Sequence, residues 1–348
     1  MYQPILKGKK GEFEAWSQVQ ANRRSSAIPL FDLVPDKGVE EDLQKFAAGL
    51  TLSIQPGDTF ALDTAALRQG ATESVTGLLS YSWLAAQLTN SAKPFRPVVH
   101  LDDENTIVAD ALAAAESMGQ QVTLRIGQTD SNSLSKKNYT SLRDFCSESS
   151  MSSGNVHLLL DFASIADGDL EACQQLAVVY LQWILANGPW ASVTLASGAF
   201  PAQISKLPKQ TANRLPRLDA NLWNYANSAA IIPGMYYGDY GVRHPELLEG
   251  PVWNGPLPNL RYATATDWIV WREAKAPSGQ PNSSFYDVCA SVTALPDYRG
   301  PSFSWGDQRV EQKSRRIPGP GAGTEWITYA TNAHIEFVID RLATLGAA

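Results

Sequence analysis

Ionisable side chains recur at the carboxyl-terminal ends of short apolar segments in this 348-residue sequence. The segments begin with apolar or neutral residues, Arg96 and His157 being the exceptions, and gain a polar group within their last few positions. Carboxylates with lysine and arginine among them are suited to acid/base chemistry and to binding polar or anionic molecules. The polar residues at these ends are Lys7, Lys9, Asp32, Asp63, His100, Asp102, Arg125, Asp161, Ser197 and Asp239.

The last of these segments ends in an acid between glycines and tyrosines, in the sequence IIPGMYYGDYG (231–241). Gly and Asp are common turn residues, so Asp239 could simply end a strand. If the strand ends meet, however, Asp239 joins a shared polar site, where Gly238 and Gly241 would let backbone approach a ligand. We therefore expect Asp239, Tyr237 and Tyr240 to contribute to that site.

Four residues are the strongest catalytic candidates, namely Lys7, Asp63, Asp161 and Asp239. Lysine could form a Schiff base or contact an anion, but beside an aspartate it is more often ion-paired, and we favour that role for Lys7. Asp63 and Asp161 could instead cap the helices that follow them. The ligand-binding candidates are Lys9, Asp32, His100, Asp102, Arg125, Ser197, Tyr237 and Tyr240.

The same residues leave other chemistry open. Several aspartates could hold Mg²⁺ through oxygen ligands, and two carboxylates could form an acid/base pair of the glycosidase kind. Asp102 begins an acidic cluster that could equally be a solvated helix start. Arginine and aspartate in one site could also neutralise each other. The four histidines are far apart, and the sequence has no phosphate-binding P-loop and no GxSxG elbow.

The elements that must position these residues alternate between strand-like and helical patterns. Most strand-like segments are continuous apolar runs, which is typical of parallel strands buried on both faces. The predicted strands are 4–9, 28–34, 59–64, 96–102, 121–127, 156–162, 192–198 and 230–239. The predicted helices are 11–24, 39–50, 74–90, 106–119, 133–149, 169–188, 218–228 and 324–345.

Eight strand–helix units predict a (β/α)₈ barrel of the TIM type, in which all strand ends open onto one face. Residues 1–240 would hold the eight strands and seven helices, and 324–348 the last helix. Residues 241–323 would be a long insertion, either a lid over the carboxyl-terminal face or a peripheral addition. An open doubly wound sheet with a carboxyl-terminal domain is the alternative.

The insertion carries one predicted strand, 266–273, and short helices around 284–294 and 306–315. Its aromatic residues could stack on a ligand or partner, but such residues more often form a small core. Its basic residues could touch phosphate, although a solvated helix face is more common. The aromatic residues are Trp253, Tyr262, Trp268, Trp271, Phe285, Tyr286 and Trp305, and the basic ones Arg309, Lys313, Arg315 and Arg316.

The composition of the chain limits the classes of partner it can bind and the cellular compartment in which we expect it. A net charge of −7 and a pI of about 5.2 make nucleic acid an unlikely partner. No apolar run is long enough to span a bilayer, and no secretory signal is present. The three scattered cysteines, Cys146, Cys173 and Cys289, form no disulfide framework or zinc site. We expect a cytoplasmic protein with no membrane partner.

Two stretches of the sequence resemble the phage beta-protein family. The first is Tyr2-x-Pro4-Ile5-Leu6-Lys7-x-Lys9-x-Gly11-Glu12, followed by Ala15 and by Ile28-Pro29-Leu30-Phe31. The second comprises Gly238-Asp239-Tyr240 and the closing Asn332-Ala333-His334-Ile335-Glu336-Phe337-Val338. The resemblance covers the whole chain and implies a phage, prophage or phage-defence context. It implies no established activity, so it assigns no catalytic role.

Two kinds of function follow from these patterns. The first is an enzyme, a hydrolase or lyase that uses carboxylates on a small polar or anionic ligand at the barrel mouth. The second is a non-catalytic binding protein in phage–host conflict, with residues 241–323 as the surface that contacts a protein partner. Fold alone does not choose between them.

Overall fold

Eight parallel strands close into a barrel in the computed structural model, which describes residues 1–70, 77–127, 146, 151–246, 256–277 and 279–348. The strand order is β1-β2-β3-β4-β5-β6-β7-β9, and β1 pairs with both β2 and β9. The predicted TIM-type barrel is confirmed. The open doubly wound sheet is wrong, because Tyr2 lies in register with Tyr237 and closes the ring. The barrel strands are β1 (Tyr2–Lys7), β2 (Leu30–Asp32), β3 (Phe60–Asp63), β4 (Phe95–His100), β5 (Val122–Gly127), β6 (Val156–Ser164), β7 (Ser192–Gly198) and β9 (Tyr236–Asp239).

Side chains alternate between the inside of the barrel and its outer surface along each strand. One buried cluster lies inside the ring, with members from six strands and from the residue after β9. A much larger cluster joins the outer faces of the strands to the helices. The inner cluster consists of Ile5, Leu30, Ala61, Val98, Leu159, Ala196 and Tyr240.

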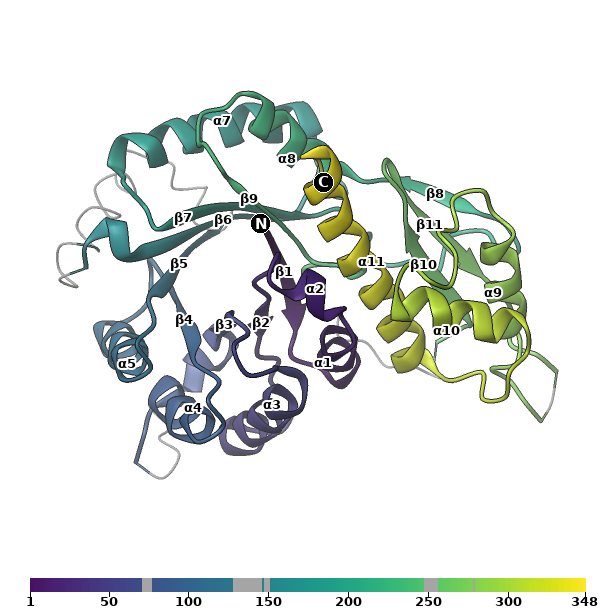
Figure 1. Cartoon of the computed structure of the whole chain (residues 1–348), viewed down its shortest axis with the longest axis horizontal. Coiled ribbons are helices and arrows are strands. Elements are labelled where there is room, and N and C mark those ends of the chain that lie inside the picture. The colour runs from purple at the N-terminus through teal and green to yellow at the C-terminus, as the bar shows by residue number, and fades with distance from the viewer. Residues whose placement is uncertain (71–76, 128–145, 147–150, 247–255, 278) are drawn as a thin grey trace.

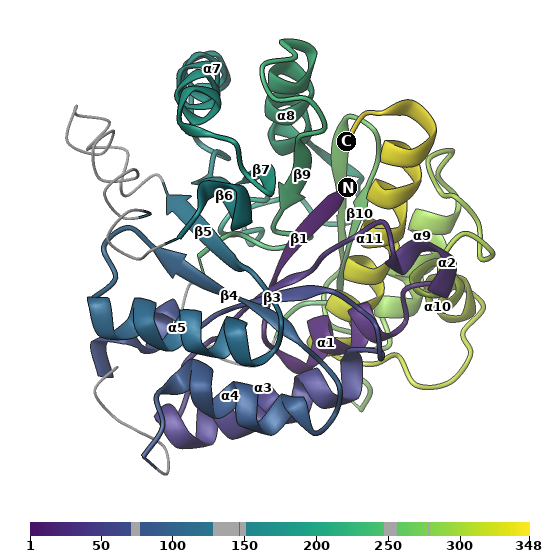
Figure 2. The ribbon, with the colours of Figure 1, turned by 60° about the vertical axis from the view of Figure 1, so that its left-hand side comes forward.

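Helices surround the barrel, as Figures 1 and 2 show. The predicted helix 11–24 is two helices, interrupted near Gln18. The predicted helix 133–149 lies outside the described residues apart from Cys146, as do residues 74–76 of the predicted helix 74–90. The helices that cover the barrel are α1 (Lys10–Ser17), α2 (Ala21–Arg24), α3 (Val39–Ser53), α4 (Ser80–Thr89), α5 (Asn105–Ser117), α7 (Leu170–Asn187), α8 (Leu218–Ser228) and α11 (Gly323–Leu345), with 3-10 turns η1 (Ala65–Gly70) and η3 (Ser153–Asn155).

A second, three-stranded antiparallel sheet lies beside the barrel, with α11 between them (Figure 1). It contains β10 (Asn259–Ala263), β11 (Asp267–Arg272) and β8 (Asn213–Pro216), so one strand comes from the segment between β7 and α8. Of these, only β11 was predicted from the sequence. Helices α9 (Phe285–Thr293) and α10 (Trp305–Ser314) complete this region, and α10 and β10 both pack on α11.

Aromatic residues of the insertion form a core in this second region. Tyr262, Trp268 and Phe285 are almost completely buried, and Phe285 stacks on Trp326 of α11 with ring centroids 4.8 Å apart. Trp253 lies outside the described residues. These buried rings fasten the second sheet to α11. Within the described ranges, no helix is both long and apolar enough to cross a bilayer.

Candidate functional site at the mouth of the barrel

Six of the polar residues predicted at the strand ends, together with Tyr240, converge inside the carboxyl-terminal mouth of the barrel. Lys7, Asp32 and Asp63 are direct register neighbours on β1, β2 and β3, and His100 is the register neighbour of Arg125. Tyr240 belongs to the inner cluster, and every other member except Arg125 lies two positions beyond a residue of it, so these side chains point inward. Arg125 points inward as well, since it donates to Asp32, Asp63 and Asp161. We call this set the mouth cluster: Lys7, Asp32, Asp63, His100, Arg125, Asp161 and Tyr240.

Arg125 is the centre of the mouth cluster. Its Nη1 donates to Asp32 Oδ1 and to Asp63 Oδ2, both at 2.8 Å. Its Nε and Nη2 both donate to Asp161 Oδ2, at 2.9 and 2.7 Å, and Nη2 also donates to Tyr240 Oη at 2.8 Å. A guanidinium has five N–H groups, so these five hydrogen bonds use all of them. Arg125 therefore holds the cluster together and has no donor left for a ligand.

The charges of the mouth cluster shift the pKa values of its members. Burial alone would raise the pKa of Asp32, but Lys7 and Arg125 outweigh it and hold that pKa below the usual value. Burial would lower the pKa of Arg125, but Tyr240 and the carboxylates raise it well above the usual value. Burial raises the pKa of Tyr240. At neutral pH Asp32 is thus a carboxylate, Arg125 a cation and Tyr240 a neutral phenol.

Asp161 is fully engaged by the protein. Its Oδ2 accepts from Arg125 and, at 2.5 Å, from Tyr240 Oη, while its Oδ1 accepts from the Ala163 backbone N–H at 2.8 Å. Only 4% of its side chain is exposed. The arrangement suits a residue that positions Arg125 and Tyr240 better than one that exchanges protons with a ligand.

The solvent-facing side of the mouth cluster contains two other pairs. His100 Nε2 lies 2.8 Å from Asp63 Oδ2, and Lys7 Nζ donates to Asp32 Oδ2 at 2.7 Å. In the first pair 19% of the His100 side chain is accessible against 3% of Asp63, and in the second 11% of Lys7 and 13% of Asp32 are accessible. Lys7 Nζ also lies 5.2 Å from the centre of the Tyr240 ring. His100, Lys7 and Asp32 are the members of these pairs that a small molecule can reach.

Asp239, Tyr237 and Ser197 do not join the mouth cluster. Gly238 and Tyr240 face the inside of the barrel, so the alternating residues Tyr237 and Asp239 point outward. Ser197 also points outward, because it lies in register with Asp239. Asp239 was expected at the shared mouth; instead it faces α11, where His334 Nε2 lies 2.7 Å from its Oδ2.

The surroundings of Asp239 form a second buried polar network. Tyr2 Oη donates to Asp239 Oδ1 at 2.6 Å, Tyr237 Oη donates to Oδ2 at 2.9 Å, and Arg217 Nη2 lies 3.9 Å away. Burial alone would raise the pKa of Asp239, but His334 and Arg217 hold it far below its usual value. The network joins the barrel wall to α8 and α11, which indicates a structural role.

The remaining predicted residues, Lys9 and Asp102, lie in solvent beyond the strand ends. Lys9 directly precedes α1, and Asp102 lies in the turn between β4 and α5. Neither reaches the mouth cluster through a hydrogen bond or ion pair among the described residues.

Sequence reasoning gave no catalytic or binding role to a second group at the rim, Glu12, Arg243 and Arg261. Glu12, on α1, is 1% exposed; its Oε1 lies 3.4 Å from Arg243 Nε, and its Oε2 has no hydrogen-bond partner in the described structure. Burial raises the pKa of Glu12, although Arg243 and Lys7 oppose the shift. Burial, and then Arg243, lower the pKa of Arg261 to about 9. Arg243 follows the eighth barrel strand closely, which could have revealed it; nothing in the sequence links Arg261 to Glu12.

No three His, Cys, Asp or Glu residues in the described ranges are arranged to hold a metal ion. The three carboxylates of the mouth cluster instead surround the Arg125 guanidinium, which supplies positive charge at their centre. Because these aspartates are already paired with Arg125, they do not form a separate set of oxygen ligands for the Mg²⁺ ion considered from the sequence.

No curated protein matches this chain. The family model described as Beta protein matches residues 2–340, which is nearly the entire length and includes every strand of the barrel and the second sheet. The match confirms the resemblance noted in the sequence, and the chain belongs to the Beta protein family.

Proposed function

We propose that this protein binds a small polar or anionic ligand at the mouth of the barrel and acts on it as a hydrolase or lyase. One observation carries the proposal: the 2.8 Å contact between His100 Nε2 and Asp63 Oδ2, on the accessible side of the mouth cluster. A carboxylate that holds one ring nitrogen fixes the tautomer of a histidine and leaves the other nitrogen to exchange a proton.

The other residues have supporting roles in this proposal. An ammonium has three N–H groups, and Lys7 gives one to Asp32, so the others could contact an anionic group. Arg243, with 25% of its side chain exposed, adds positive charge at the rim. Glu12, which is 1% exposed and lies 3.4 Å from Arg243, positions that arginine. Arg125 and Asp161 act as positioning residues.

A second candidate is a binding protein without catalysis. It is favoured by the hydrogen bonding of Arg125, which has no donor left for a ligand. All five guanidinium N–H groups are used within the protein, as in an ion network that only stabilises a fold. In this case the phage–host context implied by the family resemblance would provide the biological role, and the region of 241–323 the contact surface for a protein partner.

The experiment that tests the first candidate compares mouth variants in a ligand screen. Thermal shifts would be recorded with phosphate, small carboxylates, nucleotides and sugars, with and without Mg²⁺, because a ligand that prefers the folded state raises the melting temperature. His100→Gln and Lys7→Met should remove the shift given by the best ligand, whereas Lys209→Met, an exposed lysine elsewhere, should retain it.

Turnover of that ligand separates the two candidates. An enzyme should convert it in the wild type, and Asp63→Asn should slow conversion more than it weakens binding, because the histidine loses its orienting carboxylate. Binding that needs Lys7 and His100 without any turnover would favour the second candidate. A shift that survives both mouth substitutions would refute the mouth as the site.

A further inference from the structure

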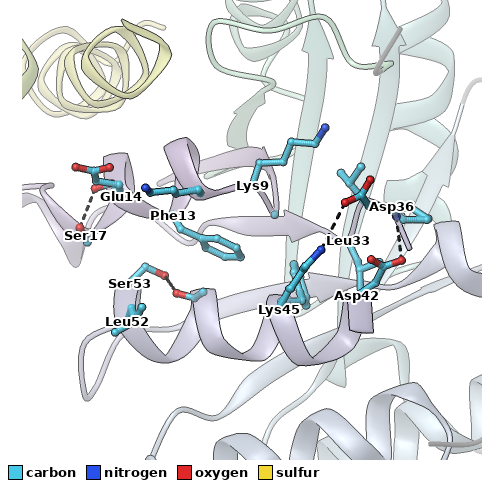
Figure 3. Close-up of a pocket in the computed structure, with 16 residues that line it drawn as sticks. Lys9, Phe13, Glu14, Ser17, Leu33, Asp36, Asp42, Lys45, Leu52 and Ser53 are labelled. Atoms are coloured by element: carbon cyan, nitrogen blue, oxygen red, sulfur yellow. Dashed lines mark hydrogen bonds and ion pairs between the residues drawn. The ribbon is translucent and has the colours of Figure 1, made fainter. Parts of the chain in front are cut away.

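A groove separate from the interior of the mouth lies between α1 and α3, just beyond the ends of β1 and β2 (Figure 3). Its volume is about 670 Å³, within the range of pockets that bind small molecules. The side chains that form its floor, Phe13, Leu33 and Phe46, are buried, and Leu52 at one end is 83% exposed.

The aromatic rings of the groove floor pack closely on their neighbours. Phe13 lies 5.1 Å from Phe31 and 5.8 Å from Phe46, measured between ring centroids. Gly49 of α3 allows this packing, because a Cβ there would lie 2.3 Å from the Phe13 ring. The cavity is thus preformed by ring packing, and a ligand would not have to order it.

Most of the polar groups that line the groove already form hydrogen bonds within the protein. Ser17 Oγ donates to the Glu14 carbonyl and Ser53 Oγ donates to the Gly49 carbonyl, both at 2.8 Å. The Asp42 carboxylate accepts from the backbone N–H groups of residues 36–38. Few groups remain to recognise a sugar or a base, so the part of a ligand that lies on the floor must be apolar.

Three lysines line the groove, and two of them lie toward one end. Lys9 and Lys10 are exposed and form no ion pair with any described residue. Lys45 is half-exposed, and its contacts with Asp36 and Glu41 are 3.5 and 3.2 Å long. In Figure 3, Lys9 and Lys45 lie toward one end and Leu52, with Glu14 and Ser17, toward the other. Asp36 and Asp42 lie at the same end, where Asp36 contacts Lys45 and Asp42 accepts from backbone N–H groups. Lys9 is thus the charged group there that has no ion pair with a described residue.

We propose that this groove binds an amphipathic anion, a molecule with an alkyl or aryl body and one anionic end group. The body lies on Phe13, Phe46 and Leu52, and the anionic end faces Lys9, with Lys45 beside it. The groove walls belong to the outer core, whereas Lys7 and Asp32 point into the barrel. The inference therefore does not depend on catalysis at the mouth.

The test uses decanoate as the anionic probe and decanol as the neutral probe of the same chain length, with the full chain titrated by calorimetry. Decanoate should bind, and more tightly than decanol. Leu52→Glu places a charge at the apolar end and should weaken decanoate at least tenfold. The matched control is Leu345→Glu, a 66% exposed leucine at the end of α11, which should change affinity less than twofold.

The lysines are tested by a Lys9→Ala, Lys10→Ala, Lys45→Ala variant, which should bind decanoate and decanol about equally. Asp63→Asn, in the mouth cluster, should leave decanoate binding unchanged, so failure of the proposed enzymatic function would not affect this result. The inference is overturned if decanoate does not bind below its micelle-forming concentration, if Leu52→Glu behaves as Leu345→Glu does, or if the lysine variant still prefers decanoate.

Discussion

Arg125 donates two hydrogen bonds to a single oxygen of Asp161, from Nε at 2.9 Å and from Nη2 at 2.7 Å. This contact fixes the plane of the guanidinium across the barrel mouth and directs Nη1 to the carboxylates on β2 and β3. The Arg125 side chain thereby connects its own strand, β5, to β2, β3 and β6 and to Tyr240, the residue after β9.

Replacing Arg125 by Met should destabilise the fold strongly. The variant leaves three buried carboxylates without their shared cation, and removing one partner of a buried ion pair costs about 3–5 kcal/mol. The unfolding free energy of Arg125→Lys should lie between those of Arg125→Met and the wild type, because an ammonium restores the charge but not the planar set of donors. Urea unfolding measures the free energies.

The matched control for this prediction is Arg315→Met. Arg315 contacts Glu311 at 2.6 Å, but 70% of its side chain is exposed, so its loss should cost less than about 1 kcal/mol. Equal losses for the two methionine variants would contradict the central role of Arg125.

Asp239→Asn tests whether the second network is structural. The substitution removes the negative charge beside Arg217 and His334, both fully buried, and should cost about 3–5 kcal/mol in unfolding free energy. Asp287→Asn, which affects an exposed pair with Arg316, should cost less than about 1 kcal/mol. Affinity for a mouth ligand, measured below the melting temperature, should stay within twofold; a large loss of affinity would place Asp239 in the site.

His157 should make the fold sensitive to acid. It lies inside the barrel at the start of β6, where its Nδ1 is 2.8 Å from Ser192 Oγ, and burial, followed by Arg96, lowers its pKa from 6.5 to about 4. Because the folded state binds the proton less readily than the unfolded state, the contribution of His157 is complete above pH 6.5 and is lost as the pH falls toward 4.

His157→Gln should therefore flatten the fall in stability between pH 6.5 and 4, even if it lowers stability at neutral pH. Urea midpoints measured at pH 7, 6, 5 and 4.5 for both proteins test this expectation. Parallel curves for wild type and variant would show that His157 does not titrate in this range.

Gly306→Ala should disturb the contact between α10 and α11. A Cβ at this position would lie 2.2 Å from the Tyr329 carbonyl oxygen and 2.9 Å from the Ala333 backbone nitrogen. Neither backbone atom can move without shifting α11, so a cost of about 1–3 kcal/mol is expected. Gly154→Ala, where the nearest atom is 3.8 Å away, should change the melting temperature little. Equal effects would indicate that α11 moves freely.

Much of the fold could be predicted from the sequence. Continuous apolar runs separated by amphipathic segments determine a parallel βα protein, and the number of runs indicated a closed barrel. The second sheet could not be predicted in the same way, since β8 and β11 are far apart in the sequence and short segments such as 213–216 carry no strand pattern of their own.

For the candidate site, the sequence by itself determined that polar residues stand at the ends of the barrel strands. Only the tertiary structure decided which of them face one another. Alternation shows that Tyr237 and Asp239 share a face, but pairing with β1 and β7 makes that face the outer one, so Asp239 meets His334 and Tyr240 meets Arg125. A register is set by contacts between distant segments, and no local pattern contains it.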